Sequence, residues 1–270
     1  MGVVNVTPDS FSDGGRYLDP EGAIQRGLSL VRDGADLLDV GGESTRPGSA
    51  PVSAEEELAR VLPVLRGLAV AGVPLSIDTS KAEVAAAACG AGATIVNDVT
   101  SLSDPAMARV VAHAGASLCL MHMQGTPATM QEAPTYRDVV AEVGDALALA
   151  VERAVAAGVM AERIVVDPGI GFGKRLEHNL ALVAACGTLM RRVGRPVLVG
   201  VSRKRFLGEL TGRPVEDRRF GTAAAVTACV LAGARIVRVH DVAEMRDVVR
   251  VADAIRRAHG EALSDGRDSG

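Results

Sequence analysis

Residues 37–48 read LLDVGGESTRPG, an apolar run that passes directly into a polar, glycine-rich cluster. The same change occurs eight times, in runs that begin near residues 2, 37, 74, 94, 117, 164, 197 and 236. A helix-compatible stretch follows each run, so the pattern predicts eight βα units. Continuous Val, Ile and Leu is typical of parallel strands covered by helices. We therefore expect an α/β fold, a single (β/α)8 TIM barrel with its site where the strands end.

The stretches between the strands predict helices over 20–33, 53–71, 80–91, 103–114, 136–158, 177–193, 217–232 and 241–259. Asp19 before Pro20 predicts a helix cap, and Ser53 with Glu56 predicts a capping box. The loops after the first and second strands are long and rich in Gly, Ser and Pro, which predicts mobile lids. We expect one domain over 1–259 and a disordered tail over 260–270, because the tail is polar and rich in Gly and Asp.

Composition limits the function classes. The 270 residues suit one barrel, for which about 250 are typical. A net charge of −4 without a basic tract argues against a nucleic-acid partner. No apolar run approaches the ~20 residues that span a bilayer, and no signal sequence is evident, so we expect no membrane partner and a cytoplasmic protein. The four cysteines lie in apolar segments without a C-x-x-C pair and are expected to be buried, reduced thiols.

Acceptor-rich side chains end three of the runs: Asp78, Asn97 and Asp167. A carboxylate can accept two parallel N–H bonds, and an amide offers one acceptor and two donors. Three such groups in one pocket suit a flat heterocycle rich in N–H groups, such as an aminopyrimidinone or a pterin. The alternative is that the Asp residues cap helices or form ion pairs.

Cations follow other strands: Arg46 after the second, Arg203 and Lys204 after the seventh, and Arg238 and His240 at the eighth. Phosphate sites of such barrels commonly lie at the loops after strands seven and eight. Asn5, Thr45 and Ser202 add neutral donors or oxygens that could face a metal. The pattern predicts a pocket with a ring-binding side and an anion-binding side.

Three further features leave alternatives open. Lys204 could form a Schiff base in an aldolase, although hydrogen bonding to a ring is favoured here. His122 is expected to pack, with pocket lining as the second choice. Phe11, Phe172 and Phe206, three of only four Phe residues, fall in predicted strand-end loops, which indicates ring stacking or an apolar slot.

An ordered series of segments carries a family resemblance: residues 5–15, 41–48, 77–79, 97–99, 167–169, 202–204 and 238–241. From about residue 2 to 255 the chain resembles the dihydropteroate synthase family of pterin-binding enzymes. The resemblance implies condensation of 6-hydroxymethyl-7,8-dihydropterin diphosphate with 4-aminobenzoate, a transferase reaction of folate biosynthesis that releases pyrophosphate. It also implies Mg²⁺ as cofactor, sulfonamides as inhibitors and a homodimer.

The resemblance also assigns residues to each ligand. It places the pterin on Asp78, Asn97, Met121, Asp167, Phe172 and Lys204. It places pyrophosphate on Asn5, Thr45, Arg46, Arg238 and His240, with Asn5 also beside Mg²⁺. It places 4-aminobenzoate on Phe11, Thr45, Pro47, Ser202 and Phe206. Asp78, Lys204 and Arg238 are the expected catalytic residues, in an SN1-like substitution that needs no strong base.

Three rival functions remain at this point. A methyltetrahydrofolate–corrinoid methyltransferase would share the ring-binding residues, but it has no use for a pyrophosphate site. A Schiff-base aldolase would use Lys204. A non-catalytic barrel would bind folate-like ligands or partners, which the two intact strand-end loops disfavour.

Overall fold

All eight predicted strands are present in the computed structural model, which describes residues 1–7, 19–45 and 49–265. They are β1 (Gly2–Asn5), β2 (Leu38–Gly41), β3 (Leu75–Asp78), β4 (Ile95–Asp98), β5 (Ser117–Met121), β6 (Ile164–Asp167), β7 (Leu198–Val199) and β8 (Ile236–Val237). The last two are only two residues long. The predicted mobility of the loops after β1 and β2 falls largely on residues 8–18 and 46–48, which lie outside the described residues.

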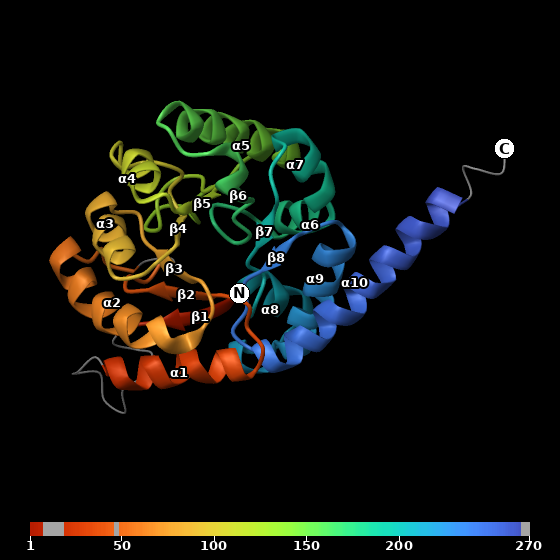
Figure 1. Cartoon of the computed structure of the whole chain (residues 1–270). Helices are drawn as coiled ribbons and strands as arrows, with labels where there is room; N and C mark the ends of the chain where they lie inside the picture. The colour runs from red at the N-terminus through yellow and green to blue at the C-terminus, as the bar shows by residue number, and fades with distance from the viewer. Residues whose placement is uncertain (8–18, 46–48, 266–270) are drawn as a thin grey trace.

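The strands form two parallel sheets that close on each other (Figure 1). Strands β1 to β6 pair in chain order, and β7 pairs with β8. Single bridges join Val166 to Val197 and Gly2 to Val239, so both edges of the small sheet meet the large one. The Val3 N–H donates to the Val239 carbonyl across the second junction, at 3.2 Å. These junctions complete the predicted (β/α)8 barrel.

Helices surround the strands in Figure 1. They are α1 (Pro20–Arg32), α2 (Ala54–Leu68), α3 (Ala82–Gly90), α4 (Met107–Ala114), α5 (Val139–Ala156), α6 (Leu176–Ala184), α7 (Cys186–Val193), α8 (Arg205–Thr211), α9 (Arg219–Leu231) and α10 (Val242–Asp265), with short 3-10 turns at Ala69–Ala71, Ala161–Arg163 and Val215–Asp217.

Four details differ from the sequence-based expectation. The helix expected over 177–193 is broken at Ala185, and α8 was not predicted. Helix α10 continues to Asp265, so the tail expected to be disordered is helical over 260–265; residues 266–270 lie outside the described part. Asp19 makes no side-chain capping bond, whereas Ser53 Oγ accepts from the Glu56 N–H at 3.1 Å and caps α2 as expected.

The core lies between the barrel wall and the helices. Fully buried side chains include Leu38 and Ile77 from strands and Leu30 and Leu65 from helices. The four cysteines are free; Cys119, Cys186 and Cys229 are buried as expected, whereas Cys89 is only half-buried. Within the described ranges, no helix combines the length and the apolar character needed to cross a membrane.

Candidate active site

The guanidinium of Arg238 donates hydrogen bonds to two carboxylates on neighbouring strands. Arg238, the residue after β8, donates from Nε to Asp39 Oδ2 at 2.6 Å and from Nη2 to Asp78 Oδ2 at 2.8 Å. Asp39 lies within β2 and Asp78 ends β3, and the register of these neighbouring strands pairs Gly41 with Asp78. Residues far apart in sequence are thereby joined across the strand ends.

Asp39 is the functional residue that the sequence argument missed. Its carboxylate is fully buried, accepts from Ser76 Oγ at 2.6 Å and from Asn97 Nδ2 at 3.1 Å, and also holds Arg238. The expected site residues lie at the ends of the runs or in the loops that follow them, whereas Asp39 lies inside a run. An ionisable group within an apolar strand was the signal that could have identified it, since buried charges must be paired.

Asp78 offers an unused acceptor. Burial raises the pKa of Asp78 to about 7, with Arg238 opposing the rise and the nearby Asp39 carboxylate adding to it. Its Oδ1 is buried and has no hydrogen-bond partner among the described residues. A buried acceptor without a partner costs free energy unless a ligand satisfies it. This atom is therefore suited to an N–H donor of a bound ring.

The opposite side of the site is formed by the ends of β6 and β7. Asp167 Oδ1 accepts from the Gly169 N–H at 2.7 Å, and burial raises the pKa of Asp167 although Lys204 opposes the rise. Lys204 Nζ donates to the Ile170 carbonyl and lies 4.4 Å from the centre of the Phe172 ring. Burial lowers the pKa of Lys204 to about 8. Lys204 also interacts electrostatically with Asp78, which links the two sides.

A second buried lysine supports this loop. Lys174 is only 3% exposed, and its Nζ lies 3.0 Å from His122 Nδ1 and 2.9 Å from the Phe172 carbonyl oxygen. Burial lowers the pKa of Lys174 to about 7; burial and the nearby Lys174 charge lower that of His122 to about 3. His122 is therefore neutral near pH 7, and its Nδ1 can accept from the ammonium. Packing was expected for His122, so this bond is a second feature that the sequence did not reveal.

Glycine at position 169 allows this loop to approach β5 closely. Gly169 has φ of 68°, and a Cβ there would overlap the His122 carbonyl oxygen. The glycines of the loop therefore permit close packing and left-handed turns. The loop needs no phosphate to explain its composition.

The turn after β7 is held in a strained conformation. Arg203 has φ of 59°, its N–H donates to Thr222 Oγ1 at 3.1 Å, and its Nε donates to Asp241 at 2.9 Å. Burial acts to raise the pKa of Asp241, but the hydrogen bond from Arg203 and the positive charges around the carboxylate together outweigh burial and lower that pKa. The sequence placed Arg203 among the expected anion-binding cations. In the structure its guanidinium pairs with Asp241 and stabilises the turn.

Ser202 and His240 meet across the β7 and β8 ends. The His240 N–H donates to Ser202 Oγ at 3.2 Å, and His240 Nδ1 lies 3.0 Å from the same oxygen. The structure thus joins Ser202, which is expected to contact 4-aminobenzoate, to His240, which is expected to bind pyrophosphate.

Of the remaining expected residues, three lie at or just after strand ends and three lie outside the described residues. Met121 is buried at the end of β5 opposite Asp167, Asn5 ends β1 opposite Gly41, and Thr45 is half-buried in the loop after β2. Phe11, Arg46 and Pro47 lie outside the described residues.

Phe206 is not in a loop. It belongs to α8, is 4% exposed and packs in the core, bordering a pocket of about 250 Å³ with Lys174 and Glu209. The expectation of a strand-end loop at Phe206 is therefore wrong, because the short helix α8 was not anticipated.

These features define a (β/α)8-barrel protein whose strand ends combine paired carboxylates, two partly neutral lysines and an arginine. Residues 1–240 match the family of pterin binding enzymes. A dihydropteroate synthase of Mycobacterium leprae is 50% identical over 94% of this chain and 92% of its own length.

Solved structures agree. A Yersinia pestis dihydropteroate synthase in complex with a sulfonamide drug has a TM-score of 0.90 and 44% identity, covering 95% of this chain and 94% of that one. A Xanthomonas albilineans dihydropteroate synthase with 4-aminobenzoic acid has a TM-score of 0.88 and 48% identity over 95% and 92%. The chain belongs to the dihydropteroate synthase family, whose members are transferases.

Proposed function

We propose that this chain condenses 6-hydroxymethyl-7,8-dihydropterin diphosphate with 4-aminobenzoate to give 7,8-dihydropteroate and pyrophosphate. The observation that carries the proposal is the buried Asp78 Oδ1, which has no partner in the described part of this family member, while Oδ2 of the same carboxylate is held by Arg238. Asp78 would supply a hydrogen-bond acceptor for the pterin ring. Arg238, which lies beside it, would supply a positive charge for the leaving diphosphate.

The pterin would lie between the two sides of the site. Asp78, Asn97 and Asp167 would accept its N–H groups, and Lys204 would donate to a ring carbonyl or nitrogen. Met121 and Phe172 would line the ring faces. Moving Lys204 Nζ from the Ile170 carbonyl to the ring exchanges one hydrogen bond for another, which keeps the buried ammonium satisfied.

The diphosphate would lie toward β1, β2 and β8. Arg238 has five N–H donors and uses two atoms for Asp39 and Asp78, so further donors remain for phosphate oxygens. His240, Thr45 and Asn5 would complete this side, together with Arg46. The 4-aminobenzoate would lie against Thr45, with Phe11 and Pro47. Ser202 would also face the 4-aminobenzoate, and its hydroxyl, which accepts from the His240 N–H, would join that side to the diphosphate side.

Mg²⁺ is proposed as the cofactor, carried by the substrate. The described residues contain no cluster of three or more His, Cys, Asp or Glu that could hold a metal alone. Mg²⁺ commonly takes only one or two protein ligands and substrate phosphates for the rest, which fits a single oxygen from Asn5. When bound it would supply positive charge to the leaving diphosphate.

The chemistry is a substitution at the pterin methylene. The C–O bond to the diphosphate breaks, the amine of 4-aminobenzoate forms the C–N bond, and the amine proton passes to solvent. Arg238 and His240 would stabilise the leaving anion, and ionised Asp78 would stabilise positive charge on the pterin. No described group needs to act as a strong base, which favours an SN1-like order of events.

A pyrophosphate-release assay tests the proposal. With the pterin diphosphate, 4-aminobenzoate and Mg²⁺, we expect stoichiometric pyrophosphate and dihydropteroate, with competitive inhibition by a sulfonamide against 4-aminobenzoate. Asp78→Asn should lower kcat by about 10²-fold or more. Pyrophosphate without dihydropteroate, or a Lys204 adduct trapped by borohydride with an aldehyde substrate, would reject it.

A homodimer is proposed through α9 and α10. Phe220 is 87% exposed on α9, and Val251 and Ile255, which are four residues apart on α10, are 61% and 54% exposed. These helices pack on each other, and α10 projects past the barrel in Figure 1. We expect analytical ultracentrifugation to give twice the chain mass, and Phe220→Asp to weaken the dimer. A monomer at micromolar concentration would contradict this.

A cytoplasmic location is also proposed, supported by the three buried free cysteines, because reducing compartments keep thiols unpaired. Fractionation of the native host with a cytoplasmic marker would test it.

A further inference from the structure

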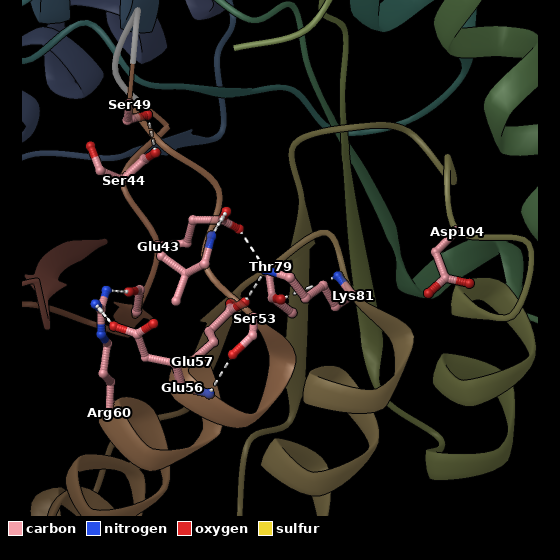
Figure 2. A network of polar contacts seen from close by, with 12 residues as sticks. Glu43, Ser44, Ser49, Ser53, Glu56, Glu57, Arg60, Thr79, Lys81 and Asp104 are labelled. Atoms are coloured by element: carbon pink, nitrogen blue, oxygen red, sulfur yellow. Dashed lines mark hydrogen bonds and ion pairs between the residues drawn. The ribbon is translucent and has the colours of Figure 1, made fainter. Parts of the chain in front are cut away.

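A partly buried ion network lies at the start of the loop that follows β2 (Figure 2). Lys81 Nζ is 2.7 Å from Glu43 Oε2 and 2.6 Å from Glu57 Oε2. The Glu57 side chain is fully buried, and those of Lys81 and Glu43 are 25% and 18% exposed. The three groups come from the β2 loop, from α2 and from the residue before α3, so the network joins three segments.

The same network fastens both ends of the loop segment 42–52. Glu43 Oε1 accepts from the Val52 N–H at 2.9 Å, which closes the segment on itself. The Gly42 carbonyl accepts from Arg60 Nη1 at 2.7 Å, and Arg60 is itself buried and paired with Glu56 on α2. The positions of Gly42 and Glu43, at the start of the loop, are therefore set by α2 and by the residue before α3.

The network also reaches the strand end that carries Asp78. The Lys81 N–H donates to Thr79 Oγ1 at 3.2 Å, and the Thr79 N–H donates to the Asn97 carbonyl at 3.1 Å. Thr45 lies only two residues beyond Glu43. The network thus connects the residue after Asp78 to the start of the loop that bears Thr45.

Stability alone does not explain this arrangement. Replacing buried ion pairs by packed apolar side chains is often neutral or stabilising, and here Glu57 Oε1 and Arg60 Nε are buried without a partner among the described residues. Burial acts to lower the pKa of Lys81, but the hydrogen bonds that Lys81 donates to Glu43 and Glu57, together with the charges of these carboxylates, outweigh burial and raise that pKa. The ammonium form that makes both contacts is therefore favoured.

We propose that Lys81 is a positioning residue for the second substrate: with Glu43 and Glu57 it fixes the start of the β2 loop, and hence Thr45, relative to Asp78. This inference rests on the proposed function, because that function assigns Thr45 to 4-aminobenzoate.

The test compares Lys81→Met with two matched variants and a remote control. Lys81→Arg keeps the charge, and Glu43→Gln keeps an oxygen for the Val52 N–H while removing the ion pair. Asp145→Asn removes an exposed ion pair with Arg192 on α5. KM for each substrate, the Kd of 6-hydroxymethylpterin and Tm are measured for every variant.

We expect Lys81→Met to raise KM for 4-aminobenzoate about tenfold while the Kd of 6-hydroxymethylpterin changes less than twofold. Lys81→Arg should recover most of the loss, Glu43→Gln should resemble Lys81→Met, and Asp145→Asn should match the wild type. Equal losses for both ligands, or a lower Tm with unchanged KM, would overturn the inference. A wild-type chain that makes no dihydropteroate would instead reject the proposed function.

Discussion

At the ends of β2, β3 and β8 one guanidinium holds two carboxylates, whereas at the β6 and β7 loops two buried lysines lie against carbonyl oxygens, an imidazole and an aromatic ring. Burial acts on both sides but in opposite directions: it raises the pKa of Asp78 to about 7 and lowers those of Lys174 and Lys204 to about 7 and about 8. Both sides therefore titrate near neutrality. The carboxylate side depends on a shared cation, and the lysine side combines neutral acceptors with the charge of Asp167.

Removing the shared cation should have the largest effect. Arg238→Met leaves Asp39 and Asp78 buried without a counter-ion, which should destabilise the fold by about 3–5 kcal/mol. It should also lower kcat by about 10²–10³-fold, since one preorganised donor is lost. Urea unfolding and steady-state kinetics measure the two effects. Arg192→Met, which breaks an exposed ion pair, is the matched control and should cost less than about 1 kcal/mol. Equal costs for the two variants would show that the carboxylates do not depend on Arg238.

Asp39→Asn should change the pH dependence of the rate. In the wild type kcat/KM should fall as the pH drops through about 7, because Asp78 must be ionised. The variant removes a neighbouring negative charge and leaves Arg238 to Asp78 alone, so the acid limb should move down by about one pH unit or more. The pH profile of kcat/KM measures this, with Asp145→Asn as control. An unmoved limb would mean that Asp39 does not influence Asp78.

Lys174→Met tests the lysine side through stability. Burial lowers the folded-state pKa of Lys174 from 10.5 to about 7. The free-energy cost of burying its positive charge is therefore fully present below about pH 7, and it disappears as the pH rises toward 10.5. The free energy of unfolding of the wild type, relative to the variant, should therefore rise by about 2–3 kcal/mol from pH 6.5 to 9.5. Urea unfolding at the two pH values measures it. Parallel pH dependences would mean that Lys174 is charged at no cost.

Phe172→Leu should have the smallest effect. The substitution removes the aromatic ring that lies 4.4 Å from Lys204 Nζ. A cation–π contact of this kind stabilises the charged ammonium over the neutral amine by about 0.5–1 kcal/mol. The alkaline limb of kcat, where Lys204 loses its proton near pH 8, should move down by about half a unit. Phe220→Leu, at an exposed ring, is the control. A limb that moves upward would contradict the assignment of Lys204 to that limb.

Much of the barrel could be predicted because each strand is one continuous apolar run and its polar end is local in sequence. The run that ends in Asp78 and the one that ends in Asp167 each indicated both a strand and a site residue. The break at Ala185 was not predictable in this way, because the apolar pattern continues through it. The close packing of α7 was also hidden: a Cβ at Gly187 would come within 2.7 Å of the Ala232 carbonyl oxygen after α9.

The candidate site was only partly predictable for a similar reason. Asp39 and Lys174 are buried by residues distant in sequence, and sequence alone does not say which polar groups lose water. The sequence shows that Arg203 is positively charged, but it does not show that Asp241 is its partner. Arg203 was therefore expected among the anion-binding cations. The order of family segments indicated the family, and only the geometry shows which of the described residues hold others in place.

Arg238 pairs with residues 199 and 160 positions before it in the chain. During synthesis the strands that carry Asp39 and Asp78 are therefore made long before their cation. Such distant contacts have a high entropic cost and form late in folding. Until β8 is in place, the two carboxylates would favour water or a proton over burial. The ends of β2 and β3 should then gain hydrogen-exchange protection only as the barrel closes, which couples the order of folding to the appearance of activity.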